Sequence, residues 1–136
     1  MGAWGIGSFE NDTAVDWTYG LEGKSDLLYI EAAFDKVLAA GADYIEAPDA
    51  EEAIAAAETV ARLQGKFGIR DAYTETVDNW ASSISTKPTP ELVTKGRLVL
   101  ARIQESPSEL LELWSDGVEA EKWHESLSEL ASRIEI

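Results

Sequence analysis

The regular occurrence of helix start and stop signals is the feature of this 136-residue sequence that most restricts its fold. Apolar residues recur three or four positions apart, and residue types that begin or end helices separate these runs. Possible strands are confined to the short pieces YIEA and KFGI, which are too small for an independent sheet. The clearest apolar stripe is the last one, formed by Trp123, Leu127, Leu130, Ala131 and Ile134. We therefore predict an all-α fold.

Start signals predict where the early helices begin. Asn11 or Asp12 is a suitable N-cap for the first helix, because its side-chain oxygen accepts a backbone N–H that has no partner within the helix. Ser25 is the corresponding residue for the second helix. Asp49 and Glu52 have the spacing of a capping box, which predicts that a third, alanine-rich helix begins after Pro48.

Two serine- or threonine-proline pairs predict later helix starts. Thr89 followed by Pro90, and Ser106 followed by Pro107, each place proline at a first helical position, where its missing N–H costs nothing extra. Between the third helix and Thr89, further apolar residues at helical spacing predict a fourth helix. Gly96 interrupts the apolar face of the helix after Thr89, which indicates a close helix crossing. The expected architecture is a compact single-domain bundle of about six to seven helices with short turns.

Length and composition exclude several classes of protein. A chain of 136 residues fits one domain over residues 1–136. The absence of cysteine removes thiol nucleophiles and disulfides, and a single histidine removes multi-histidine metal sites. No stretch has the pattern of a signal peptide or a membrane span, so we expect a cytoplasmic protein with no membrane partner. We also expect no metal and no cofactor.

Charge restricts the choice of partner. The net charge is −15, from 11 basic and 26 acidic residues, which disfavours contact with nucleic acid phosphates or anionic lipids. A basic protein is the partner that such a surface favours. The simpler alternative is that the negative charge keeps the protein soluble, as a monomer or a weak homo-oligomer.

The opening run MGAWGIGSFENDTAVDW combines glycines, aromatic residues and acids. Its G-x-G lacks both a preceding strand and a third glycine, so it is not a dinucleotide loop. The preferred interpretation is a structural anchor, in which glycines let the backbone pass close to packed elements and aromatic side chains are buried. The anchor residues are Trp4, Gly5, Gly7, Phe9 and Trp17.

The acids of the same run support a functional alternative. Glu10, Asp12 and Asp16 surround the start of the first helix, and Asp12 and Asp16 share one helical face. Their oxygens suit a hard cation such as Mg²⁺ or Ca²⁺, or an arginine from a partner. These three carboxylates are therefore candidate cation or partner contacts.

Two runs resemble the family catalogued as domain of unknown function 4259. They are GAWGIGSFENDTAVDW near the start and SELLELWSDGVEAEKWHESLSEL near the end, so the resemblance spans nearly the full chain. The resemblance implies a compact, mainly helical domain of a group of small bacterial proteins. It implies no activity, substrate or catalytic residue.

The single histidine, His124, is the remaining candidate contact. It follows Trp123, which we predict to be a core anchor, and Glu121 and Glu125 flank it. A carboxylate–imidazole pair there would suit acid–base chemistry. The commoner arrangement is a histidine at the edge of the core, and no nucleophile or second base stands at a recognisable spacing from it.

Two functions from different classes remain open. The first is a non-catalytic interaction protein, such as an adaptor or an immunity protein, that binds a basic partner through its negative surface. The second is a small metal-dependent hydrolase that uses Glu10, Asp12 and Asp16, with His124 folded close by. Only in the second case do these carboxylates converge around a pocket.

Overall fold

The computed structural model describes residues 5–115 and 119–134 of the chain. Within these ranges it contains seven α-helices, one 3₁₀ turn and no strand, which confirms the predicted all-α bundle. A parallel bridge joins Ile45 to Ser108. The elements are α1 (Asp12–Tyr19), α2 (Leu28–Ala39), α3 (Ala47–Leu63), η1 (Ala72–Thr74), α4 (Glu75–Ser83), α5 (Pro90–Ile103), α6 (Glu109–Ser115) and α7 (Ala120–Arg133).

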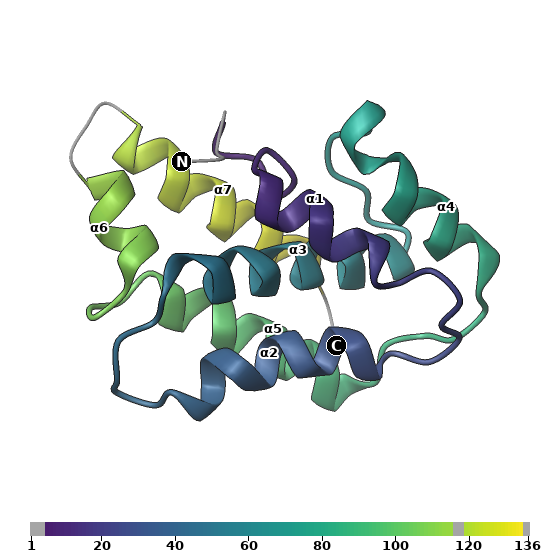
Figure 1. Ribbon diagram of the computed structural model, residues 1–136, viewed down its shortest axis with the longest axis horizontal. Coiled ribbons are helices and arrows are strands. Elements are labelled where there is room, and N and C mark those ends of the chain that lie inside the picture. The colour runs from purple at the N-terminus through teal and green to yellow at the C-terminus, as the bar shows by residue number, and fades with distance from the viewer. Residues whose placement is uncertain (1–4, 116–118, 135–136) are drawn as a thin grey trace.

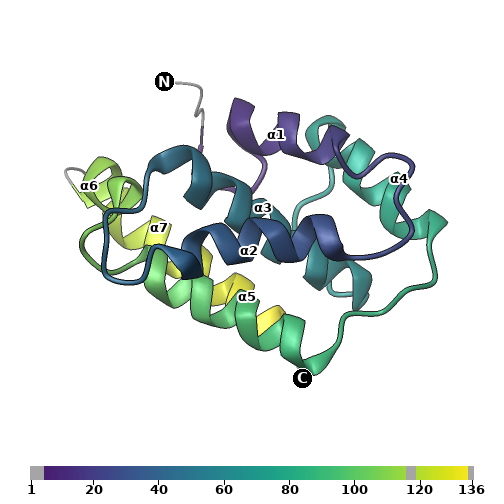
Figure 2. The same cartoon turned by 60° about the horizontal axis from the view of Figure 1, so that its bottom comes forward.

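Helix α3 lies at the centre of the bundle. It contacts α1 on one side and α2 and α5 on the other, as Figures 1 and 2 show, and it also contacts α4, α6 and α7. Every residue from 53 to 63 is buried, and five of these eleven are alanines. Small side chains let neighbouring backbones approach closely, which is why a helix with little bulk occupies the middle. None of the helices in the described ranges is long and apolar enough to cross a membrane.

Two of the predicted helix caps are confirmed. The Asn11 side chain accepts a hydrogen bond from the backbone N–H of Ala14 at 2.7 Å, at the start of α1. The Thr89 hydroxyl accepts one from the N–H of Leu92 at 3.2 Å, and Pro90 begins α5 as predicted. In both cases the cap is local, so the sequence signal is sufficient.

The predicted starts of α2, α3 and α6 are wrong by a few residues. Helix α2 begins at Leu28, where Asp26 rather than Ser25 accepts a backbone hydrogen bond. Helix α6 begins at Glu109, after Ser108 and not after Ser106. In α2 and α6, the start depends on which nearby polar side chain reaches the free backbone N–H groups.

The start of α3 is supplied by a distant residue. The helix begins at Ala47, before Asp49, so Pro48 lies in its first turn and the predicted capping box does not form. Instead, the Glu109 carboxylate at the start of α6 accepts the N–H of Ala47 at 2.7 Å. This cap joins residues 62 positions apart and has no local sequence pattern.

Gly96 lies at a close helix crossing, as its position in the apolar face of α5 predicts. A β-carbon added there would lie 3.1 Å from Cζ of Phe34 and 3.4 Å from Cδ1 of Ile134. Both neighbouring side chains are fully buried, so neither has free space to move into.

We expect Gly96→Ala to lower the free energy of unfolding. Overpacking costs about 1–3 kcal/mol, which outweighs the gain of about 1 kcal/mol in helix propensity. Urea denaturation measures the change. Ala101→Gly, at an exposed position of the same helix, measures the propensity effect alone. A Gly96→Ala variant more stable than wild type would show that Phe34 is not fixed at this crossing.

Candidate functional site

A buried ion network connects α3 to α4. Arg62 of α3 lies 2.7 Å from Glu58 one helical turn earlier, and its Nε lies 2.6 Å from Oδ1 of Asp78 in α4. The Arg62 and Glu58 side chains are 1% and 5% exposed. The other oxygen of Asp78 accepts a hydrogen bond from the Thr74 hydroxyl at 2.9 Å. Charges this far from water are tolerated because each has an opposite charge within hydrogen-bonding distance.

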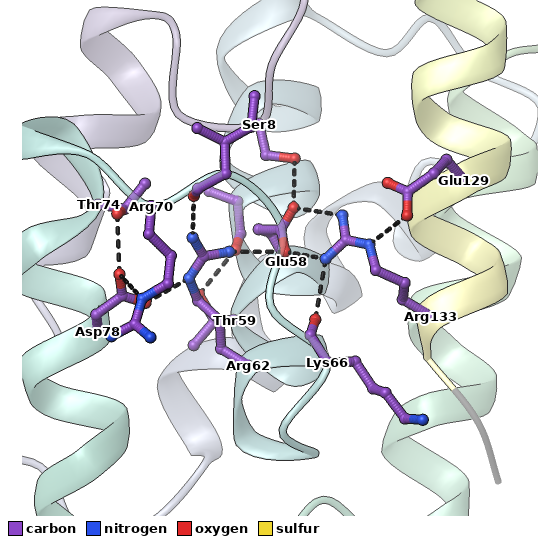
Figure 3. A network of polar contacts seen from close by, with 12 residues as sticks. Ser8, Glu58, Thr59, Arg62, Lys66, Arg70, Thr74, Asp78, Glu129 and Arg133 are labelled. Carbon is purple, nitrogen blue, oxygen red and sulfur yellow. Dashed lines mark hydrogen bonds and ion pairs between the residues drawn. The ribbon is translucent and has the colours of Figure 1, made fainter.

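Arg133 at the end of α7 joins the same network from the other side. Its two terminal nitrogens lie 2.6 and 2.7 Å from the two oxygens of Glu58, and its Nε lies 2.6 Å from Glu129 (Figure 3). The hydrogen bonds that Arg133 donates to Glu58 raise the pKa of Arg133 well above its ordinary value. Two arginines therefore share one buried glutamate, whose Oε1 also accepts a hydrogen bond from Ser8 at 3.3 Å.

The two arginines also hold the loop that follows α3, residues 64–71, by its backbone. Arg62 donates from Nη2 to the carbonyl of Ile69 at 2.5 Å, and Arg133 donates from Nη1 to the carbonyl of Lys66 at 3.0 Å. Asp71 ends the loop with a capping box at η1, in which its side chain accepts the N–H of Tyr73 at 2.9 Å. A loop without helix or strand is thus attached at three points along its length.

A cleft of about 340 Å³ opens beside this network, and we call it the arginine cleft. It lies between the opening run, α3, the loop and α7. Its lining consists of Gly7, Ser8, Phe9, Glu10, Glu58, Arg62, Gly68, Ile69, Asp71, Tyr73, Thr74, Ser126, Glu129 and Arg133. Four carboxylates and two arginines are among these residues, so the lining carries two negative charges in excess.

The glycines of the opening run make room for one of these carboxylates. The Glu10 side chain folds back and accepts the N–H of Gly7 at 2.9 Å. A β-carbon at Gly7 would lie 2.5 Å from the nearer Glu10 oxygen, and one at Gly5 would lie 2.7 Å from the carboxylate. Gly5 and Gly7 therefore leave space for an acid at the cleft wall.

The aromatic residues of the predicted anchor are buried where the structure describes them. Phe9 is 4% exposed, Trp17 is 5% exposed and Trp123 is 2% exposed. Trp17 stacks on Tyr29 with ring centroids 4.9 Å apart. Trp4 lies outside the described residues. Among the anchor residues, Gly7 and Phe9 also line the arginine cleft.

The three predicted carboxylate contacts do not converge. Glu10 lines the cleft, whereas Asp12 and Asp16 are exposed on α1 and are not part of its lining. Across residues 5–115 and 119–134, no group of three histidine, aspartate or glutamate side chains is placed to hold a metal ion. Of the predicted contacts, Glu10 is the one that faces a cavity.

His124 also lies apart from the cleft. Its Nδ1 is 2.8 Å from the Oε1 of Gln104, and its ring meets Trp123 edge-on at 4.9 Å. The amide of Gln104 donates through its nitrogen to the Leu100 carbonyl, so its oxygen faces the imidazole. This orientation makes Nδ1 the donor, and His124 joins α7 to α5.

Sequence reasoning missed the charged centre of the site. Glu58, Arg62, Asp78 and Arg133 come from three helices, and their pairings join residues as far as 75 positions apart. A usable signal did exist for the first two, because Glu58 and Arg62 stand four residues apart inside an alanine-rich helix, among apolar neighbours. Charges in that position are buried as a pair or not at all. Asp78 and Arg133 carry no comparable signal.

Comparison with known proteins gives one family. The sequence model of the family described as Domain of unknown function (DUF4259) matches residues 2–126, which agrees with the resemblance of both ends of the chain. No curated protein and no solved structure matches the chain.

Replacing Arg62 by methionine tests the network. Because Asp78 would lose its closest cation and Glu58 one of two, we expect Arg62→Met to lower the free energy of unfolding by about 3–5 kcal/mol. Chemical denaturation measures this. The control is Lys36→Met, which removes the cation of an exposed ion pair with Glu52. This variant should lose less than about 1 kcal/mol of unfolding free energy. Equal losses in the two variants would contradict the assignment.

Proposed function

We propose that the chain, which belongs to the DUF4259 family, is a non-catalytic interaction domain that binds a basic segment of another protein, as an adaptor or an immunity protein does. The arginine cleft is the proposed binding site. The observation that carries the proposal is the excess of carboxylates over arginines in its lining.

Both arginines of the cleft lining already form ion pairs within the protein. Arg62 lies against Glu58 and Asp78, and Arg133 lies against Glu58 and Glu129. Glu10 and Asp71 make no ion pair with any residue in the described part of the chain. A cation entering the cleft would therefore meet two carboxylates that form no ion pair with another described residue.

The walls of the cleft suit a basic side chain. Phe9, Ile69 and Tyr73 give it an apolar surface, against which the aliphatic stem of an arginine or lysine packs while its charged end reaches the carboxylates. The volume of about 340 Å³ is at the small end of ligand sites, which favours one side chain over a large cofactor. The overall charge of −15 adds long-range attraction for a basic partner.

Contacts within the cleft favour binding over catalysis. The Ser8 hydroxyl points at Glu58, whose two oxygens already accept hydrogen bonds from Arg133. A serine nucleophile needs a base that is able to take its proton, and this carboxylate is instead engaged with two guanidinium groups. His124 is paired with Gln104 and is not among the cleft residues.

Binding of a fluorescein-labelled nona-arginine peptide, followed by anisotropy, tests the proposal. We expect Glu10→Gln to weaken binding about threefold to tenfold, because the amide removes one of the two carboxylates that are not paired. Binding should also weaken as sodium chloride is raised. The substitution retains an oxygen that accepts the N–H of Gly7, so folding should be preserved.

The matched control is Glu91→Gln. Glu91 is exposed in the first turn of α5 and lies outside the cleft, so this variant changes the net charge equally. It should weaken binding less than about twofold. Equal losses for Glu10→Gln and Glu91→Gln would mean that the peptide senses only the overall charge, and the cleft would not be the binding site.

A further inference from the structure

Exposed apolar side chains gather beside the arginine cleft. Phe67, Ile69 and Tyr73 are 40%, 71% and 51% exposed, and we call these three residues the apolar rim. They are three of the eight exposed large hydrophobic residues in the described part of the chain, yet they fall within seven consecutive positions. Ile69 and Tyr73 also line the cleft, so the rim and the cleft form one continuous surface.

We propose that the apolar rim is the second half of the binding site, and that the partner is a protein carrying an apolar patch next to the basic side chain that enters the cleft. This inference rests on the function proposed for the cleft. It adds the chemistry that distinguishes one basic partner from another, because the cleft by itself selects only for positive charge.

The attachment of the loop supports this role. Arg62 and Arg133 hold the carbonyls of Ile69 and Lys66, so two ion-paired arginines fix the backbone that carries Phe67 and Ile69. The guanidinium of Arg70 covers the Phe67 ring at 4.5 Å from its centroid. Binding to a surface that is already ordered loses less conformational entropy than binding to a mobile loop. Buried ion pairs add little net stability, and their main effect here is to hold the loop backbone in one geometry.

Charge supports the same partner. The loop's own exposed cations, Lys66 and Arg70, are not among the cleft residues. The positive charge of the loop therefore lies outside the cavity, while Glu10 and Asp71 lie within it. A partner that matches this pattern places its basic group in the cleft and uncharged apolar atoms on the rim. Apolar and aromatic anchors next to a charged pocket are typical of binding hot spots.

Two labelled hexapeptides of equal charge test the proposal. One alternates arginine with leucine and the other alternates arginine with glycine. We expect the wild-type protein to bind the leucine peptide at least fivefold more tightly. Ile69→Ser should abolish this preference, because it should weaken binding of the leucine peptide at least fivefold more than binding of the glycine peptide. Because Ile69 is 71% exposed, its replacement should not affect folding.

The control is Leu28→Ser on α2, an equally exposed leucine outside the cleft lining, which should keep the preference. A preference that survives Ile69→Ser, or that Leu28→Ser abolishes equally, would overturn the role of the rim. Failure of the cleft proposal gives a different result, in which Glu10→Gln leaves the affinity for both peptides unchanged.

Sedimentation velocity of the wild type distinguishes a foreign partner from a second copy of the chain. We expect a monomer at micromolar concentration. A dimer that Ile69→Ser dissociates, and Leu28→Ser does not, would assign the rim to self-association and overturn the proposed partner.

Discussion

The pairing of Glu58 with Arg62 is the interaction on which the rest of the site depends. Both side chains project from the second half of the central helix, where every residue from 53 to 63 is buried. Two charges buried there must be satisfied by groups from outside α3, because one ion pair does not use all their hydrogen-bonding atoms. Asp78, Arg133 and the backbone of the 64–71 loop supply those groups. The requirement to satisfy this pair thus places α4, the end of α7 and the loop around one point.

The opening run has two roles: its aromatic residues are part of the core, and its glycines let an acid lie beside the arginine cleft. Phe9 and Trp17 are buried, as residues of a structural anchor would be. The glycines lie close to a carboxylate, and they let Glu10 fold back beside the cleft. A single short segment therefore contributes to the core and supplies the proposed site with Glu10, a carboxylate that forms no ion pair with another described residue.

Local patterns in the sequence predict much of this fold and little of the site. Helix periodicity and the caps at Asn11 and Thr89 depend on neighbours within four residues, so they are visible in the sequence. The cap of α3 by Glu109 and the pairing of Glu58 with Arg133 join residues 62 and 75 positions apart, and no local pattern indicates them. Glu10 was predicted as a contact from its charge, but its companions in the cleft were not Asp12 and Asp16. In the folded protein, Glu10 instead lines the cleft together with Asp71 and the two arginines.

We infer that the hydrogen bonds of Arg62 and Arg133 order the loop that borders the arginine cleft. Backbone ¹⁵N relaxation measures this directly in the wild type and in Arg133→Met, which releases the carbonyl of Lys66. We expect order parameters near 0.85 for Phe67 to Arg70 in the wild type, similar to those of the helices. In the variant they should fall below about 0.6, while the amides of α3 stay rigid. A loop that is mobile in the wild type, or that is equally ordered in the variant, would contradict the claim.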